Sequence, residues 1–338
     1  MEGARVLIET LGESEDWSVL AVDDRLTEWR SPTRLLPPGG LRLVAQAHER
    51  RERVQMRLAG HGLGEHTVSA GPVFGPDGRV HAVQVRIAAD GEPLPEPYAV
   101  AAFGYSSQAC SIRLGRPAFD WPLPRDRSSW TVPEAFRYVE RFDGSMELIL
   151  RTVEPVAGSR WSGDVTARLG HRLRRYRLAV RNGVGAAAYC WRGLIQDITQ
   201  YRAPEEISLD GAALSVLGQQ AAGNGHLVLA DARQVRLIRW ITDPVPGIQW
   251  KGMVDDRDTP HPDDVARILA EVDRVTRDGR THGRVDGVRL RRMGGGWTVV
   301  DAVGTIIPTP DTARLMLLEL TVVGSSDDPD PTESRGDE

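Results

Sequence analysis

The sequence is poor in cysteine and has no long apolar run. Its two cysteines, Cys110 and Cys190, lie far apart and in no CxxC arrangement, so neither a disulfide framework nor a zinc knuckle can be built from them. We expect both to be small buried residues. No run of roughly 18 apolar residues occurs, and the segment MEGARVLIETLGESEDW has acids where a signal peptide carries basic and apolar regions. These absences predict a soluble cytoplasmic protein.

Positive charge is not in excess either. The net charge of −5 and the pI near 6.0 give no attraction to phosphate backbones or anionic lipids, so neither nucleic acid nor a membrane is expected as a partner. What is present is the composition of an ordinary globular protein, 41% hydrophobic and 26% charged. A chain of 338 residues exceeds what one core usually organises, which predicts two or three domains.

Residues 1–97 have the pattern of a first domain that begins with a strand pair. Two β-prone runs, residues 5–10 and 17–22, are separated by a polar turn-forming linker. Apolar residues then recur at helical spacing over residues 41–58, with arginines on the other face. This spacing predicts one helix.

A hairpin is expected to close this first domain. A Gly-Pro-Asp-Gly turn leads into residues 79–87, where alternation predicts that Val83, Val85 and Ile87 share one face of a strand. We place His81 opposite these residues, exposed to solvent.

Residues 98–204 are assigned to a second domain. A proline- and charge-rich stretch comes before a predicted helix over residues 130–139. Three strand-like runs follow, at residues 160–169, 174–180 and 186–198, and an Asn-Gly pair between the last two suits a tight turn.

Residues 205–323 are assigned to a third domain. It begins with a predicted helix over residues 209–222, and a second helix is expected to start at Pro262, where the proline and two aspartates suit the first turn. Residues 324–338 are acidic and lack apolar side chains, so we expect a disordered tail. The predicted strands of the third domain are residues 226–231, 235–242, 283–291, 296–307 and 314–323.

One block of the third domain resembles a known pattern. Trp250, Met253-Val254 and the run His261-Pro262-Asp263-Asp264 look like the W…(V)HPDD pattern of PAS domains, although residues 255–260 form an insertion. With residues 7–12, 17–22 and 78–85, this block makes the whole chain similar to a mycobacterial and actinobacterial family of triple sensor-domain proteins, described as PAS–GAF–PAS.

The resemblance implies a fold and a way of working. The expected fold class is α+β, with three consecutive PAS/GAF-like domains, each an antiparallel sheet with helices packed on it. The middle domain could equally be PAS-like by pattern. The resemblance also implies a homodimer, whose interface the helices at residues 41–58 or 209–222 could supply, and a signalling role. It brings no cofactor and no catalytic residues.

Motifs for catalysis and metal binding are weak. A GxGxxA string at residues 183–188 is followed by a predicted strand instead of the helix that a dinucleotide site needs, so we interpret it as a turn. His61, Glu65 and His66 lie in a glycine-rich loop, and the helix start explains the cluster at residues 261–264. We predict no metal site, no catalytic residue and therefore no enzyme.

Aromatic residues suggest a ligand pocket in the third domain. His226, Trp240, Trp250 and Trp297 are expected around its sheet and the loops near its mouth, where sensor domains can hold a ligand between sheet and helix. We take these four as candidate ligand-binding residues, with the ligand unknown.

The sequence therefore favours a cytoplasmic sensor or adaptor that binds a small ligand or a protein partner and acts through an effector in another chain. The first alternative is an interaction scaffold whose domains have filled cores. The second is an enzyme with a dispersed site, such as one of the cysteines with His171 or His226.

Overall fold

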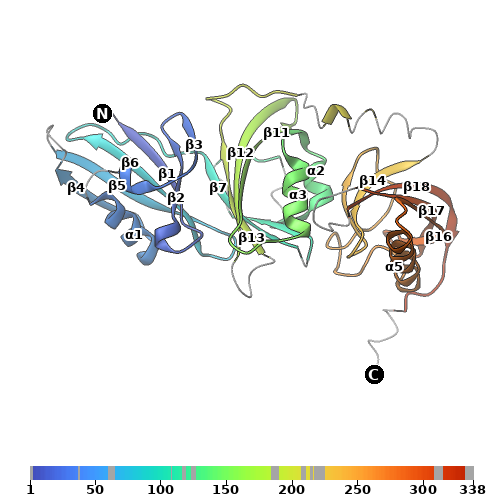
Figure 1. Cartoon of the computed structure of the whole chain (residues 1–338). Coiled ribbons are helices and arrows are strands. Elements are labelled where there is room, and N and C mark those ends of the chain that lie inside the picture. The colour runs from blue at the N-terminus through green and yellow to red at the C-terminus, as the bar shows by residue number, and fades with distance from the viewer. Residues whose placement is uncertain are drawn as a thin grey trace.

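Three antiparallel sheets follow one another along the chain (Figure 1). The structure is a computed structural model, and it describes residues 3–36, 39–59, 65–107, 109–115, 119–122, 127–183, 190–206, 211–213, 216, 225–307 and 315–331.

The first sheet has six strands in the order β3-β2-β1-β6-β5-β4, with one helix lying against β5 and β6. The turn predicted after Phe74 joins β5 to β6, and both strands of the expected N-terminal pair are confirmed. Its elements are β1 (Ala4–Glu9), η1 (Ser14–Asp16), β2 (Ser18–Val22), β3 (Arg25–Arg30), η2 (Pro32–Arg34), α1 (Gly40–Arg50), β4 (Val54–Ala59), β5 (Glu65–Phe74) and β6 (Val80–Ala89).

The middle sheet has seven strands in the order β10-β11-β12-β13-β7-β8-β9, with two short helices. Its elements are β7 (Val100–Ser106), β8 (Ser111–Leu114), β9 (Ser129–Thr131), α2 (Val132–Phe136), β10 (Val139–Phe142), α3 (Ser145–Val153), β11 (Arg160–Leu169), β12 (Arg172–Asn182) and β13 (Cys190–Asp197).

The third sheet has five strands in the order β15-β14-β18-β17-β16. Its long helix begins where the sequence predicts, and the His261 Nδ1 atom accepts a hydrogen bond from the Asp263 backbone N–H at 3.2 Å. Its elements are β14 (His226–Asp231), β15 (Arg236–Trp240), α5 (Pro262–Arg277), β16 (His282–Arg291), β17 (Trp297–Ile306) and β18 (Leu315–Ser326).

The predicted fold class is wrong. The three sheets supply most of the regular structure, which makes a β-rich fold and not the α+β arrangement of PAS and GAF domains. Two predicted helices are much shorter than expected. The helix predicted over residues 41–58 ends at Arg50, because Arg51 adopts a left-handed backbone with φ of 58°, and the chain then enters β4. The helix predicted over residues 130–139 shrinks to α2 between two strands.

Of the helix predicted over residues 209–222, residues 211–213 and 216 are described and are helical, and the rest lies outside the described residues. The tail predicted to be disordered was residues 324–338, but its first three residues belong to β18, which runs to Ser326. Further along, Asp330 pairs with Arg291, while residues 332–338 lie outside the described residues.

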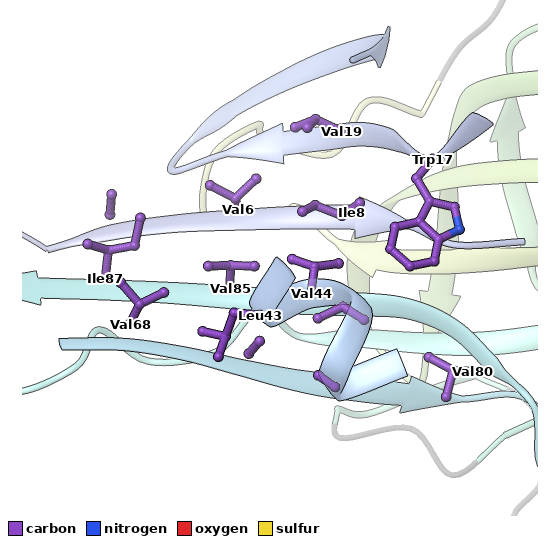
Figure 2. Close-up of a cluster of buried hydrophobic side chains, with 14 residues drawn as sticks. Val6, Ile8, Trp17, Val19, Leu43, Val44, Val68, Val80, Val85 and Ile87 are labelled. Atoms are coloured by element: carbon purple, nitrogen blue, oxygen red, sulfur yellow. The ribbon is translucent and has the colours of Figure 1, made fainter. Parts of the chain in front are cut away.

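The sheets and helices form alternating layers. One face of the first sheet packs on α1, and the shared core includes Leu43 and Val44 of the helix with Val85 of β6 (Figure 2). The other face packs on the middle sheet, where Leu7 and Leu20 meet Leu194 and their neighbours. This burial on both faces explains why β1 and β6 contain few exposed residues.

The helices α2 and α3 lie between the middle sheet and the third sheet (Figure 1). On one side, Phe136 and Leu148 pack against the aromatic core of the middle sheet. On the other side, Ile149 of α3 packs against Leu229 and Leu315 of the third sheet. The long helix α5 covers the opposite face of the third sheet, so the last two sheets share one thin layer of helices.

A buried ion pair joins the first two sheets. Glu9 of β1 is fully buried, and its carboxylate accepts hydrogen bonds from the Arg181 Nε and Nη2 atoms of β12 at 2.9 and 3.1 Å. The Leu11 backbone N–H donates to the same carboxylate at 2.9 Å. Burial raises the pKa of Glu9 above its ordinary value, while the attraction of Arg181 opposes this rise.

Three smaller expectations are also corrected. His81 is fully buried, with its Nδ1 atom 3.3 Å from the Gly193 carbonyl oxygen of the middle sheet. Cys110 is only half-buried and Cys190 is exposed. Within the described ranges, no helix is both long enough and apolar enough to cross a membrane.

The variant Arg181→Met should be strongly destabilised, because it leaves the Glu9 carboxylate buried without a counter-charge. We expect a loss of about 3–5 kcal/mol in the free energy of unfolding at neutral pH, measured by urea denaturation. Without Arg181, the pKa of Glu9 should rise further. The folded state then binds the proton more tightly than the unfolded state, so the loss should shrink as the pH falls from 8 towards 5.

The double variant Glu9→Gln/Arg181→Met is the matched control. It removes both charges, so its loss should be smaller and nearly independent of pH over the same range. A loss in Arg181→Met that stays constant with pH would contradict the role assigned to the Glu9 charge.

Candidate ligand-binding cavity

A chamber lies between the middle sheet and its two short helices. It consists of two adjoining cavities of about 160 and 120 Å³. We call the first the inner cavity and the second the aromatic cavity, because Trp121, Tyr138 and Tyr176 line the latter. The residues lining both are Phe103, Ile112, Val132, Phe136, Phe142 and Leu178.

Local sequence determines where the two helices beside the chamber begin. Thr131 caps α2 with a capping box, in which its hydroxyl accepts from the Glu134 backbone N–H and the Glu134 carboxylate accepts from the Thr131 backbone N–H. Gly144 takes a left-handed φ of 74° and begins α3 directly after β10. With five and nine residues, these helices reach only about 8 and 14 Å along the sheet.

The third sheet closes one end of the chamber. Arg236 and Ile238, which share one face of β15, line the inner cavity. Leu237 between them borders both this cavity and a smaller one under α5. The inner cavity is therefore lined jointly by two sheets that are distant in sequence. A change in what fills it would act directly on the contact between them.

Polar groups gather where β15 meets the middle sheet. The Arg236 Nη1 atom donates to the Ser107 carbonyl oxygen at 2.8 Å and lies 3.3 Å from the Cys110 Sγ atom. The Tyr105 hydroxyl is within hydrogen-bonding reach of the same thiol, and burial raises the pKa of this phenol, so it stays protonated. Asp231 is also buried, and burial raises its pKa.

Three buried polar atoms that line the inner cavity have no hydrogen-bond partner among the described residues. They are the Trp191 Nε1, Ser145 Oγ and Arg236 Nε atoms. Buried polar groups are normally paired, so these three atoms are available to hydrogen-bond with a molecule that enters the cavity.

The four predicted ligand-binding residues do not line the chamber. Trp250 instead joins two sheets, because its indole N–H donates to the Thr131 hydroxyl at 2.7 Å and so reaches the cap of α2. Trp240 packs in the same core cluster as Trp250. The His226 Nδ1 atom lies 2.8 Å from the Asp243 carbonyl oxygen. Trp297 is fully buried, and its indole N–H donates to the Asp328 carbonyl oxygen at 2.9 Å.

The third sheet has a smaller cavity of its own. It measures about 70 Å³, lies under α5, and is lined by apolar residues such as Ile268, Val272 and Leu290. The described lining of this cavity also lacks the four predicted residues. In the ranges that the structure describes, no group of three or more His, Cys, Asp or Glu side chains could hold a metal ion.

Sequence reasoning missed the residues that line the chamber. Phe103 and Tyr105 alternate along β7, and Leu178 and Val180 do the same on β12, but such alternation marks a core face as readily as a cavity. No pattern distinguished Arg236 from the many other arginines of the chain.

Comparison with known proteins identifies the family. The model of the Rv3651-like N-terminal domain matches residues 5–96, and that of the Rv3651-like C-terminal domain matches residues 210–321, together more than half of the chain. The chain belongs to the Rv3651-like family. Its two matched domains contain the first and third sheets, and most of the chamber lies in the segment between them. No curated protein matches the sequence.

Among solved structures, an uncharacterised protein from Mycobacterium tuberculosis has the same fold. It is 17% identical, the match covers 98% of each chain, and the TM-score is 0.75. An RNA-binding light-oxygen-voltage receptor also matches, at 9% identity over 67% of this chain and 96% of its own. Its TM-score of 0.26 is too low to carry an argument.

The variant Leu178→Phe should be tolerated, because the larger side chain can extend into the chamber. We expect the free energy of unfolding to change by less than about 1 kcal/mol, whereas Leu43→Phe in the packed core under α1 should lose about 1–3 kcal/mol. Urea denaturation of both variants makes the comparison. Equal losses would mean that the space around Leu178 is already filled.

Proposed function

We propose that this chain is a non-catalytic receptor for a small apolar molecule, which binds in the chamber and alters the contact between the middle and third sheets. The observation that carries the proposal is the chamber itself. Two adjoining cavities of about 160 and 120 Å³ lie against the middle sheet, and apolar cavities of such sizes hold small aromatic molecules.

The position of the chamber supports a sensing role. Its walls come from the middle sheet, from α2 and α3, and from β15 of the third sheet. A ligand that touches all of these favours the arrangement in which they enclose it, and this preference is the free energy that a sensor uses to shift a population. The effector protein and the homodimer expected from the sequence stay predictions.

Binding can be tested with the uncharged fluorescent probe 1-aminoanthracene and the full chain. We expect saturable binding with an increase in probe fluorescence. The variant Leu178→Trp should weaken binding at least tenfold because the indole occupies the chamber, while Leu178→Ala at the same position should still bind. Circular dichroism confirms that both variants are folded. Failure of the wild-type chain to bind would overturn the proposal and favour the scaffold alternative.

Coupling to the third sheet can be tested by hydrogen exchange. When the probe is saturating, the amide hydrogens of β15 should exchange more slowly, because Leu237 and Ile238 contact the bound molecule. The amides of β1, which lies on the far side of the middle sheet, serve as the internal control. Slower exchange confined to β7, β12 and β13 would show a ligand site without coupling to the third sheet.

A further inference from the structure

We infer that the ligand of the chamber is an apolar molecule with a carboxylate group, and that Arg236 binds this carboxylate. The inference rests on the proposed function and specifies its ligand class. It comes from the polar end of the inner cavity, where β15 meets β7 and β8.

In the part of the chain that the structure describes, Arg236 lacks the carboxylate partner that the buried Arg181 and Arg291 have. Buried Arg181 pairs with Glu9, and buried Arg291 pairs with Asp330. Within the described residues, no carboxylate oxygen forms an ion pair with Arg236, whose contacts are the Ser107 carbonyl oxygen and the Cys110 thiol. Asp231 lies opposite Arg236 in the pairing of β14 with β15 and attracts it, but the two side chains form no ion pair. A partly buried guanidinium group gains most from an anion that contacts it directly.

The unpaired atoms nearby all can donate hydrogen bonds. An indole N–H and a guanidinium Nε–H only donate, and a serine hydroxyl can donate as well. Trp191 lies directly opposite Tyr105 in the pairing of β13 with β7. Because the Tyr105 hydroxyl reaches the Cys110 thiol, which contacts Arg236, these residues form a continuous polar end of the cavity.

A carboxylate is the group that matches such donors. It accepts at two oxygens and donates nothing, and its hydrogen bonds to charged donors are about twice as strong as neutral ones. A neutral hydroxyl or amide would satisfy some of the donors but would leave Arg236 without an anion in direct contact. The remaining lining of the chamber is apolar and aromatic, so the rest of the molecule must be apolar.

Asp231 lies opposite Arg236 in the pairing of β14 with β15, and the attraction of Arg236 opposes the rise of the Asp231 pKa. Asp231 lines the inner cavity, but its Oδ1 atom accepts from the backbone N–H groups of Arg233 and Gln234 at 2.9 and 3.2 Å, so the hairpin turn uses it. Its charge would oppose a second carboxylate. Removing that charge should therefore strengthen binding of an anion relative to a neutral molecule of the same shape.

The test uses two ligands of the same shape, naphthalene-2-carboxylate and naphthalene-2-carboxamide, which compete with 1-aminoanthracene for the full chain at pH 7.5. Their fused rings suit two adjoining cavities. We expect the wild-type chain to bind the carboxylate about tenfold more tightly than the amide. Arg236→Gln should reduce this ratio to about one, Arg236→Lys should retain part of it, and Asp231→Asn should increase it.

The outcomes separate this inference from the proposed function. If both ligands displace the probe equally well from the wild-type chain, the chamber binds apolar molecules but the carboxylate inference is wrong. If the probe itself does not bind, both proposals fail. The wild-type ratio and the Asp231→Asn increase do not depend on Arg236→Gln being folded. A ratio that survives Arg236→Gln in folded protein would overturn the role of Arg236.

Discussion

The thin layer formed by α2 and α3 is the constraint on which the rest of the structure depends. These two helices must cover one face of the middle sheet and one face of the third sheet at once. The strands β11 and β18, of ten and twelve residues, extend about 33 and 40 Å, more than twice the reach of either helix, so the two helices cannot fill the layer from end to end. The chamber lies where the coverage ends, and the turn and strand beside it bring Arg236 into its wall.

Electrostatics follow from the same layering. Glu9 of the first sheet is buried between layers and is paired with Arg181 of the middle sheet. Arg236 also lies between layers, and its position differs in that the neighbouring groups are a backbone carbonyl and a thiol. Among the described residues, Arg181 has a carboxylate in contact and Arg236 has none. This contrast is why we assign the binding of a ligand carboxylate to Arg236.

Much of the local structure could be predicted from the sequence. The proline and aspartates after His261 correctly predicted the start of α5, and the alternation of Val83, Val85 and Ile87 correctly predicted β6. The same alternation places His81 on the face of these residues, since positions two apart share a face of a strand. The burial of His81 could therefore have been predicted from the sequence. The end of α1 could not be predicted, because Val54 and Leu58 continue the helical spacing although they lie in the edge strand β4.

The fold class and the chamber could not be predicted in this way. The number of helices that pack on each sheet depends on contacts between segments more than 80 residues apart, such as the hydrogen bond from Trp250 to Thr131. A tryptophan in a sensor-like pattern suggested a ligand contact, whereas here it anchors one sheet to the helix cap of another. Residues such as Phe103, Leu178 and Arg236 come together only after the three sheets have stacked.

The Glu9–Arg181 pair also bears on how such a protein can evolve. New multidomain proteins often arise when a gene segment that encodes one domain is copied into another gene. A copy of the first sheet without the middle sheet would lack the cation of Glu9 and would expose Leu7 and Leu20 to water, and a copy of the middle sheet alone would lack the anion of Arg181 and expose Leu194. These two sheets are therefore expected to be inherited together, as a single unit of recombination.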